Sequence, residues 1–266
     1  MLNGMKDTFL RSKPLLGMLH LQPLAGSLNY ARQGTRPIID AAFAELDALE
    51  RGGVDGILVE NLGDAPFAKT APVETVAMMT TVFQKLVERS SVPMGINVLR
   101  NDGLAAVAIA SATGAKMVRV NVICGVAFTD QGMVEGQARQ ILNMRKDLAA
   151  DLLILADVHV KHAAHLTTLE EAAVDAQRNG PDALIVSGIA TGRRTAPTDL
   201  QAVRRSVCIP VFVGSGVRLD NVSMYREADG FIVGTALKKE GRVGEPVDVD
   251  RVKAMAEAVA SLREDS

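Results

Sequence analysis

The sequence predicts an α/β protein that forms one (β/α)8 barrel domain over residues 1–266, with residues 1–13 as an N-terminal extension. Eight short apolar runs alternate with longer segments of helical periodicity, and this order requires parallel strands joined by right-handed crossovers. Hydrophobic residues make up 48% of the chain but aromatic residues only 3%, so the core is built from aliphatic side chains, as in a barrel buried on both faces. No linker rich in Pro or Ser divides the chain, which indicates a single domain.

The apolar runs predict the strands in chain order. We expect strands over residues 15–21, 54–60, 94–98, 117–122, 152–158, 183–187, 211–214 and 230–234. Between the runs, apolar residues recur at steps of three and four, as on a helix with one face on a core. The clearest such stripe is Val252, Met255, Val259 and Leu262. Eight strand–helix units favour a closed barrel over an open sheet, and no Gly-x-Gly-x-x-Gly turn follows the first strand.

Composition excludes several classes of protein. Lys plus Arg number 29 against 31 Asp plus Glu, and few aromatic residues can stack on bases, so we expect no nucleic-acid partner. Cys124 and Cys208 lie far apart without the spacing of metal ligands, which is typical of reduced thiols in a cytosolic protein. Residues 1–14 lack the apolar core of a signal peptide, and no run of about 18 uncharged apolar residues predicts a transmembrane segment. We therefore expect a cytoplasmic protein, and a homo-oligomer.

Two glycine-bearing loops follow the seventh and eighth predicted strands. Gly214, Ser215 and Gly216 lie in the first loop, and Gly234 and Thr235 lie in the second. In barrels these two loops commonly bind phosphate, because glycines let backbone N–H groups approach an anion and a short helix adds positive potential. The structural alternative is that the glycines only form tight barrel corners. The paired loops favour a phosphorylated small-molecule ligand.

Polar residues end nearly all the other predicted strands, at the end of the barrel where barrel enzymes place their chemistry. Side chains alternate along a strand, so Asp157, His159 and Lys161 should share one face, and Arg119 and Asn121 another. The residues predicted to converge on one cavity are His20, Glu60, Asn97, Arg119, Asn121, Asp157 and His159. Ser187 ends the sixth strand at the same edge.

Five of these residues are candidate catalytic groups. We expect Glu60 and Asp157 to act as general base and acid if burial separates their pKa values. His159 or His20 can move a proton near neutral pH, and Lys161 can pair with a substrate anion or form a Schiff base. The residues expected to bind substrate are Asn97, Arg119, Asn121 and Ser187, with Arg119 holding a carboxylate or phosphate bidentately.

Arg119, Lys161 and the loop over residues 129–132 can each be explained without a role in catalysis or binding. Arg119 can simply form a buried ion pair with Asp157 or Glu60. Lys161 can lie on the loop beyond its strand. The run of residues 129–132 is either a lid over the mouth of the barrel or a polar surface turn.

Three histidines spaced by three residues raise the question of a metal. His159, His162 and His165 could join Asp157 as ligands. They lie where a strand becomes a loop, however, and no His-x-His follows the first strand, so we expect no metal and no cofactor.

Five segments resemble the BtpA/SgcQ family. They are KPLLGMLHLQPL at residues 13–24, GILVEN at 56–61, GINVLRND at 95–102, VRVNV at 118–122 and ADVHVKH at 156–162. With the two glycine loops, the resemblance covers nearly the whole chain and implies a barrel related to phosphate-binding barrels. One family name comes from a cyanobacterial member linked to photosystem I biogenesis, and the other from a member in a carbohydrate-utilisation gene region. The second origin suits a phosphosugar substrate, and the resemblance assigns no catalytic residues.

Three functional hypotheses follow. The first is an enzyme with isomerase, epimerase or lyase chemistry on a phosphorylated sugar or nucleoside-like metabolite. The second, implied by the resemblance, is a non-catalytic biogenesis or assembly factor. The third is a metal-dependent hydrolase built on Asp157, His159 and Glu60. An anion at the two glycine loops together with an empty polar pocket favours the first hypothesis. A filled mouth and a large apolar exterior patch favour the second, and a tightly bound metal favours the third.

Overall fold

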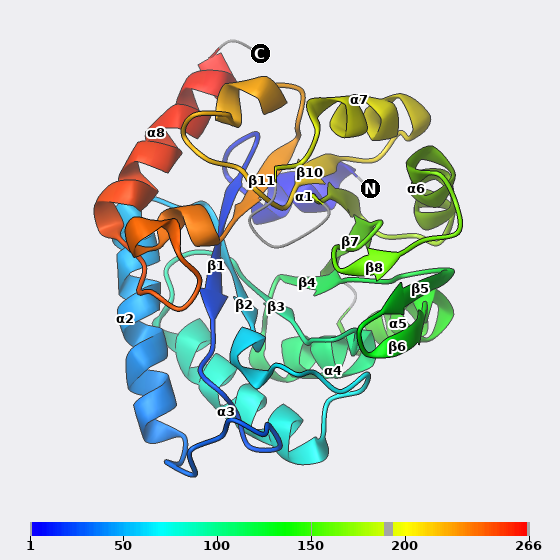
Figure 1. The fold of residues 1–266 in the computed structure, drawn as a ribbon. Coiled ribbons are helices and arrows are strands. Elements are labelled where there is room, and N and C mark those ends of the chain that lie inside the picture. Colours follow the sequence, from blue (N-terminus) through cyan, green and yellow to red (C-terminus); the bar gives the residue numbers. More distant parts are fainter. Residues whose placement is uncertain (1, 150, 189–193, 265–266) are drawn as a thin grey trace.

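Eight parallel strands close into a barrel in the computed structural model, which describes residues 2–149, 151–188 and 194–264 (Figure 1). Around the barrel the strands follow the order β1-β2-β3-β4-β7-β9-β10-β11, and β11 pairs with β1. Their bounds are β1 Leu15–His20, β2 Gly56–Glu60, β3 Met94–Asn97, β4 Met117–Val120, β7 Leu153–Val158, β9 Ala183–Val186, β10 Val211–Val213 and β11 Gly230–Val233. Each strand lies within one of the eight predicted runs, which confirms the (β/α)8 barrel. Residues 1, 150, 189–193 and 265–266 of the predicted domain lie outside the described residues.

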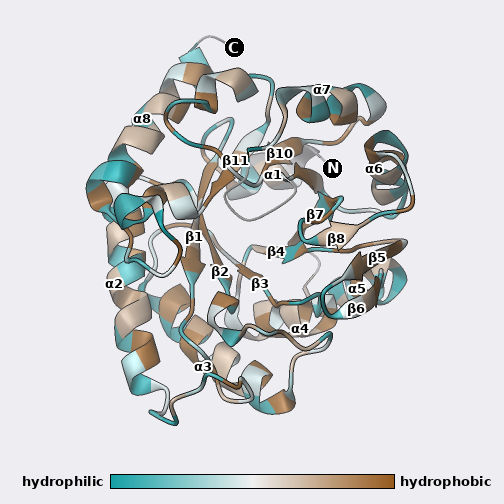
Figure 2. Ribbon diagram, in the orientation of Figure 1, coloured by the Kyte–Doolittle hydropathy of each residue, from teal (hydrophilic) through white to brown (hydrophobic). Residues whose placement is uncertain are grey.

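Helices cover the outside of the barrel. The helices that follow the strands are α2 Arg36–Gly52, α3 Val73–Arg89, α4 Gly103–Thr113, α5 Ala138–Leu148, α6 Leu169–Arg178, α7 Pro197–Ser206 and α8 Val249–Glu264. Figure 2 shows mostly hydrophobic barrel strands inside helices of mixed character. The predicted stripe of α8, from Val252 to Leu262, is buried, and this helix packs against α2. Short 3-10 helices complete the loops: η1 Leu62–Asp64, η2 Val222–Tyr225, η3 Thr235–Leu237 and η4 Lys239–Gly241.

The predicted N-terminal extension forms a short helix, α1 Leu2–Thr8, that closes one end of the barrel. Met5 and the following Phe9 are buried in one cluster with Leu16 and Leu153, which lie near the starts of β1 and β7. A carbon added at Gly56, the first residue of β2, would lie 3.2 Å from the ring of Phe9. The segment therefore forms an apolar floor at the N-terminal ends of the strands and leaves the opposite end as the mouth.

Alternation along the strands follows the predicted parity. Val118, Val120 and Val158 belong to the outer core between the strands and the helices. Met117 and Leu155 belong to the inner cluster of the barrel. Side chains on the parity of Met117 and Leu155 therefore point into the barrel, and this set includes Arg119 and Asp157.

A small antiparallel sheet stands above the barrel, and it contains residues 129–132, for which either a lid or a polar surface turn was expected. Strand β5 Val126–Thr129 pairs with β6 Gly132–Glu135 and with β8 Ala163–Ala164. The four residues 129–132 form the tight turn of the β5–β6 hairpin. The inner face of the sheet buries Ala127 and Val134 on Val122 and Val160 from the loops after β4 and β7, so the hairpin is fixed to the rim by apolar packing.

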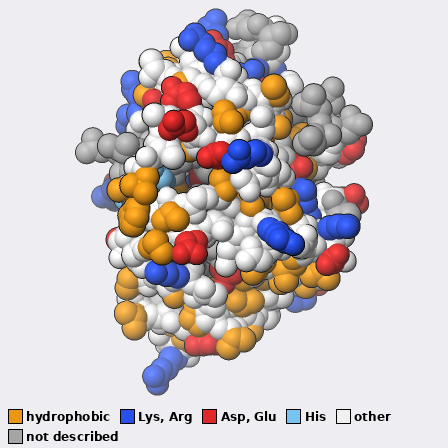
Figure 3. All heavy atoms as spheres, turned by 90° about the vertical axis from the view of Figure 1, so that its right-hand side faces the viewer, with side chains coloured by type: hydrophobic (Ala, Val, Ile, Leu, Met, Phe, Trp, Pro, Cys, Tyr) orange, Lys and Arg blue, Asp and Glu red, His pale blue; other side chains and the backbone are white. Residues whose placement is uncertain are grey.

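Figure 3 looks onto the side of the molecule that carries α6 and this small sheet. Basic, acidic and apolar side chains are interspersed on that face. Within the part of the chain that the structure describes, no helix is both long and apolar enough to cross a membrane.

Candidate functional site

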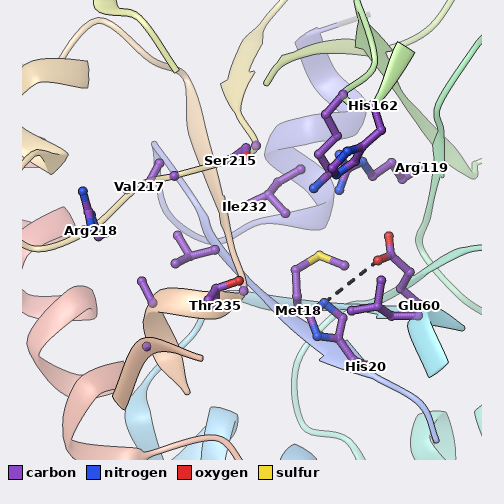
Figure 4. A pocket seen from close by; sticks show the side chains of 18 of the residues that line it. Met18, His20, Glu60, Arg119, His162, Ser215, Val217, Arg218, Ile232 and Thr235 are labelled. Carbon is purple, nitrogen blue, oxygen red and sulfur yellow. Dashed lines mark ion pairs between the residues drawn. The ribbon is translucent and has the colours of Figure 1, made fainter. Parts of the chain in front are cut away.

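The mouth of the barrel opens into a pocket of about 670 Å³. Figure 4 shows Ser215, Val217 and Thr235 on one side of this pocket and Glu60 and Arg119 on the other. The predicted site residues that line it are His20, Glu60, Arg119, Asn121, Lys161, Gly214, Ser215, Gly216, Gly234 and Thr235. Asn97 and Asp157 do not line the pocket but contact its lining residues from below, and Ser187 in turn contacts Asp157. Of the seven residues predicted to converge on one cavity, His20, Glu60, Arg119 and Asn121 line it, Asn97 and Asp157 lie in the network beneath it, and His159 lies outside it.

Arg119 and Asp157 form a fully buried ion pair beneath the pocket. Arg119 Nε and Nη2 donate to the two oxygens of Asp157 at 3.0 and 2.9 Å, and the side chains are 2% and 0% exposed. Asn121 Nδ2 also donates to Asp157 at 2.7 Å, and the Ser187 hydroxyl donates at 3.2 Å. Burial opposes the charge of Arg119, but attraction to Asp157 prevails and raises the pKa of Arg119. The ion-pair alternative raised by the sequence is the arrangement found.

Asn97 joins the ion pair to the neighbouring strand. Its Nδ2 donates to the backbone oxygen of Arg119 at 3.0 Å and to Asn121 Oδ1 at 3.1 Å. Its own Oδ1 is buried, and no described residue donates to it. Four polar side chains from β3, β4 and β7 and the loop after β4 are therefore locked into one network, which fixes the floor of the pocket.

Glu60 and His20 end two adjacent strands. Gly17 to His20 of β1 run in register with Ile57 to Glu60 of β2, so the side chains of His20 and Glu60 lie side by side. His20 Nε2 is 4.0 Å from Glu60 Oε1 (Figure 4). Burial, followed by the positive charges of Lys238, Lys161 and Arg119, lowers the pKa of His20 to about 3. The imidazole is therefore neutral at physiological pH.

The loop after β7 departs from the predicted alternation. His159 and His162 adopt the left-handed conformation, with φ of 52° and 59°, so the chain turns sharply at each of them. His159 turns away from the pocket, stacks on His165 at 4.2 Å and lies 3.5 Å from the Thr167 hydroxyl. Burial and then the neighbouring His165 lower the pKa of His159 to about 4. The expectation that His159 faces the cavity was therefore wrong, because parity applies only to extended backbone.

Lys161 reaches the pocket from that loop, beyond the end of the strand. It lines the pocket together with His162. Burial lowers the pKa of Lys161, and the charge of Arg119 lowers it further. The charges of Glu60 and Asp157 oppose this lowering, so Lys161 lies among charges of both signs.

Arg100 is one of the lining residues that the sequence did not single out. It follows β3, is 6% exposed, and donates from Nη2 to the backbone oxygen of Lys161 at 2.7 Å. Its neighbours hold it in place: Asn101 exchanges two hydrogen bonds with the backbone of Val122, at 2.8 and 3.0 Å. Asp102 caps α4 by accepting from Ala105 N at 2.9 Å. A basic residue two positions before a helix cap, just after the end of a strand, is the signal that could have identified it.

The two glycine loops form the opposite wall. Gly216 has a φ of 67°, which favours glycine, and its carbonyl accepts from Asn221 Nδ2 at 2.9 Å. A carbon added at Gly234 would lie 3.3 Å from Met18 and 3.5 Å from His20, so this loop packs directly on β1. Thr235 begins η3, the short helix expected beside a phosphate site. Arg218 and Arg251 also line this part of the pocket.

A metal centre on the predicted residues does not form. Asp157 is saturated by Arg119, Asn121 and Ser187, and His159 lies outside the pocket. Among the described residues, no group of three or more His, Cys, Asp or Glu side chains could hold an ion. Cys124 is a partly buried free cysteine, and burial raises the pKa of its thiol. Both features are typical of an unreactive, reduced thiol.

Comparison with known proteins adds a family and a set of fold neighbours. Residues 11–261 match the sequence model of the BtpA family. An uncharacterised protein of Pyrococcus furiosus is 45% identical over 97% of this chain and 99% of its own. The photosystem I biogenesis protein BtpA of Synechocystis sp. is 44% identical over 96% of this chain and 90% of its own.

Two solved structures share the barrel. The thiamine phosphate pyrophosphorylase from Pyrococcus furiosus has a TM-score of 0.59 at 19% identity, covering 95% of this chain and 98% of its own. The N-(5'-phosphoribosyl)anthranilate isomerase from Pyrococcus furiosus also has a TM-score of 0.59, at 12% identity, covering 94% of this chain and 99% of its own. At these identities the likeness supports the fold alone.

Proposed function

We propose that this chain, which belongs to the BtpA family, is an enzyme that moves a proton next to a carbonyl group in a phosphorylated sugar or nucleoside-like metabolite. The observation that carries the proposal is one pocket with two glycine loops on one wall and a carboxylate beside a neutral imidazole on the other. The two fold neighbours are named for phosphorylated compounds, which is consistent with a phosphate at the loops.

The glycine loops would hold the phosphate. Their position after β10 and β11, and the short helix η3 that begins at Thr235, are the features that phosphate-binding barrels use. Arg218 and Arg251 add positive charge at the same wall. A phosphate held there leaves the rest of the ligand to extend toward Glu60 and His20.

Glu60 would act as the base and His20 as the electrophile. The Glu60 carboxylate takes a proton from the carbon next to the carbonyl, while the neutral imidazole of His20 donates a hydrogen bond to the carbonyl oxygen. Delivery of a proton to the opposite face of the same carbon gives an epimer, and its delivery to the former carbonyl carbon of the enediol of a hydroxycarbonyl compound gives an isomer. A carboxylate paired with a neutral histidine is an established way to run this chemistry near neutral pH.

Hydrogen exchange tests this proposal directly. A thermal-shift screen of phosphorylated sugars identifies ligands, since binding at a hundredfold excess over the dissociation constant stabilises by about 2.7 kcal/mol. Each ligand is then incubated in heavy water, and mass spectrometry measures deuterium on carbon. We expect Glu60→Gln to slow the exchange by about 10²–10⁴-fold without changing the thermal shift. The control Glu257→Gln, the same change on the exposed side of α8, should exchange as the wild type does, and equal rates in both variants would refute the role of Glu60.

An assembly role is the second candidate, and one surface feature favours it. Phe128 and Met133 face each other across the β5–β6 hairpin and are 44% and 46% exposed. A relative 44% identical is named a photosystem I biogenesis protein. In a host that depends on this protein, rescue by Glu60→Gln but not by Phe128→Ser would favour assembly over catalysis.

A further inference from the structure

Two cations occupy the side of the pocket that faces the glycine loops. In the ring of eight strands, β3 lies four places from β10 in either direction, so Arg100, just after β3, lies diametrically across the mouth from Gly216. The hydrogen bond from Arg100 to the backbone of Lys161 places Lys161 beside it. The pocket thus has positive charge at both ends.

Neither cation is neutralised by a contact with a carboxylate. Among the described residues, no Asp or Glu oxygen lies within 4.0 Å of the Lys161 ammonium or the Arg100 guanidinium. Arg100 uses one guanidinium N–H group for Lys161, and its other guanidinium donors have no hydrogen-bond partner among the described residues. Arg119 differs from them, because Asp157 accepts two of its hydrogen bonds.

The carboxylates at this end do not contact these two cations. Arg100, Arg119 and Lys161 share this end of the barrel with Glu60, Asp130 and Asp157, and Asp157 is bound to Arg119. Burial, followed by the charge of Arg119, lowers the pKa of Lys161. A carboxylate placed between Lys161 and Arg100 would accept their donors and offset the cost of burying their charges.

Hydrogen bonds hold Arg100, and sharp backbone turns flank Lys161. Arg100 lies between Asp102, which caps α4, and the backbone of residue 68, whose oxygen accepts from Arg100 N at 3.1 Å. Lys161 lies between two left-handed residues, His159 and His162. Preorganised donors lose little freedom when an anion binds, so the pair is suited to recognise a planar group with two oxygens.

We infer that the pocket takes a phosphorylated acid, with its phosphate at the glycine loops and its carboxylate on Lys161 and Arg100. This inference rests on the proposed function, which supplies the phosphate end and the reacting carbon between the two ends. It narrows the substrate class from any phosphorylated sugar to those that carry an acid group at the far end.

A matched pair of ligands tests the inference. 6-Phosphogluconate and glucitol 6-phosphate differ only by a carboxylate in place of a hydroxymethyl group at the end far from the phosphate. We expect the wild type to bind 6-phosphogluconate about 10–100-fold more tightly by calorimetry, the range of one or two charge-assisted hydrogen bonds. Lys161→Met and Arg100→Met should each bring that ratio down toward one and leave the affinity for glucitol 6-phosphate unchanged. Lys253→Met, the same loss of charge at an exposed site on α8, should keep the full ratio.

The outcomes separate this inference from the proposal beneath it. Equal affinity of the wild type for both ligands, or a ratio that survives both Lys161→Met and Arg100→Met, would overturn the carboxylate site while leaving phosphate binding intact. A hexitol 1,6-bisphosphate that binds more tightly than 6-phosphogluconate would overturn the carboxylate assignment in favour of a second phosphate. Failure of every one of these ligands to bind would overturn both proposals. Since Arg100 is buried, circular dichroism tests whether Arg100→Met folds. If the arginine variant is unfolded, the result for Lys161→Met decides.

Discussion

Asp157 receives four hydrogen bonds inside the barrel, and two of them come from Arg119 on the neighbouring strand. The pair joins β4 to β7 beneath the pocket, with both side chains almost fully buried. A carboxylate with all its acceptor sites occupied has little freedom to accept a proton from a substrate. Asp157 therefore acts first as the anchor of Arg119, and the acid–base role in our proposal falls to Glu60 and His20.

Replacing Asp157 by Asn should destabilise the fold. The new side-chain NH2 group would replace an oxygen that accepts hydrogen bonds, so it would face the N–H groups of Arg119 or Asn121. The charge of Arg119 would then be unpaired. We expect a loss of about 3–5 kcal/mol in the free energy of unfolding, measured with urea. Asp40→Asn, which breaks the exposed pair of Asp40 with Arg36 on α2, should cost at most about 1 kcal/mol. If Asp157→Asn were as stable as Asp40→Asn, the anchoring role would be wrong.

His20 should make the protein sensitive to mild acid. Its folded pKa of about 3 lies below its usual 6.5, so the unfolded chain binds the proton more readily. Its stabilising contribution is present above about pH 6.5 and is lost as the pH falls toward 3, by up to about 1.4 kcal/mol per pH unit. His20→Gln should remove that part of the pH dependence in urea titrations at about pH 7 and about pH 5. An imidazole signal of His20 that titrates near 6.5 by NMR would contradict the burial argument.

Alanine at Gly216 should separate stability from ligand binding. Gly216 and Gly34 have similar positive φ angles, 67° and 75°, but only Gly216 lines the pocket. Both substitutions should cost about 1–2 kcal/mol of stability through the left-handed backbone. Only Gly216→Ala should also weaken phosphate-ester binding, by about 1.5–3 kcal/mol for each charge-assisted hydrogen bond lost. If the two variants bound such ligands equally well, the glycine would only shape a barrel corner.

Binding of a phosphorylated acid should be coupled to proton uptake by Lys161. The lowered pKa of the lysine rises when a carboxylate lies against it, so the amine takes up a proton on binding. Affinity should therefore fall as the pH rises through the lowered pKa of the free protein. Calorimetry in buffers of different ionisation enthalpy measures the uptake, and Lys161→Met should abolish it. Uptake that persists in that variant would point to another group.

The predictable part of the site lies inside the strands. Arg119 and Glu60 stand on extended backbone, where the period of two fixes the face of every side chain, so the sequence placed them in the barrel. His159 lies one residue beyond Val158, the end of β7, and its φ of 52° cancels the period. Residue propensities do not predict that a particular histidine adopts the left-handed backbone conformation.

The features missed by the sequence depend on contacts between distant segments. Arg100 matters because it meets the backbone of Lys161, 61 residues along the chain. The β5 strand, Val126–Thr129, is too short for a clear alternation and is stabilised by Val122 and Val160 beneath it. In α1, Met5 and Phe9 are the buried apolar residues, and the barrel floor rather than its own periodicity keeps that helix in place.

The apolar floor formed by Met5 and Phe9 closes one of the two ends by which a ligand could enter or leave the barrel. Because side chains fill that end, a ligand cannot pass through the barrel from one end to the other. Whatever enters at the mouth leaves by the same route, and the water it displaces must pass it on the way out. A protein docked beneath α1 could not receive a product along the barrel axis. Any hand-over to a second enzyme has to occur at the rim, beside the glycine loops and the β5–β6 hairpin.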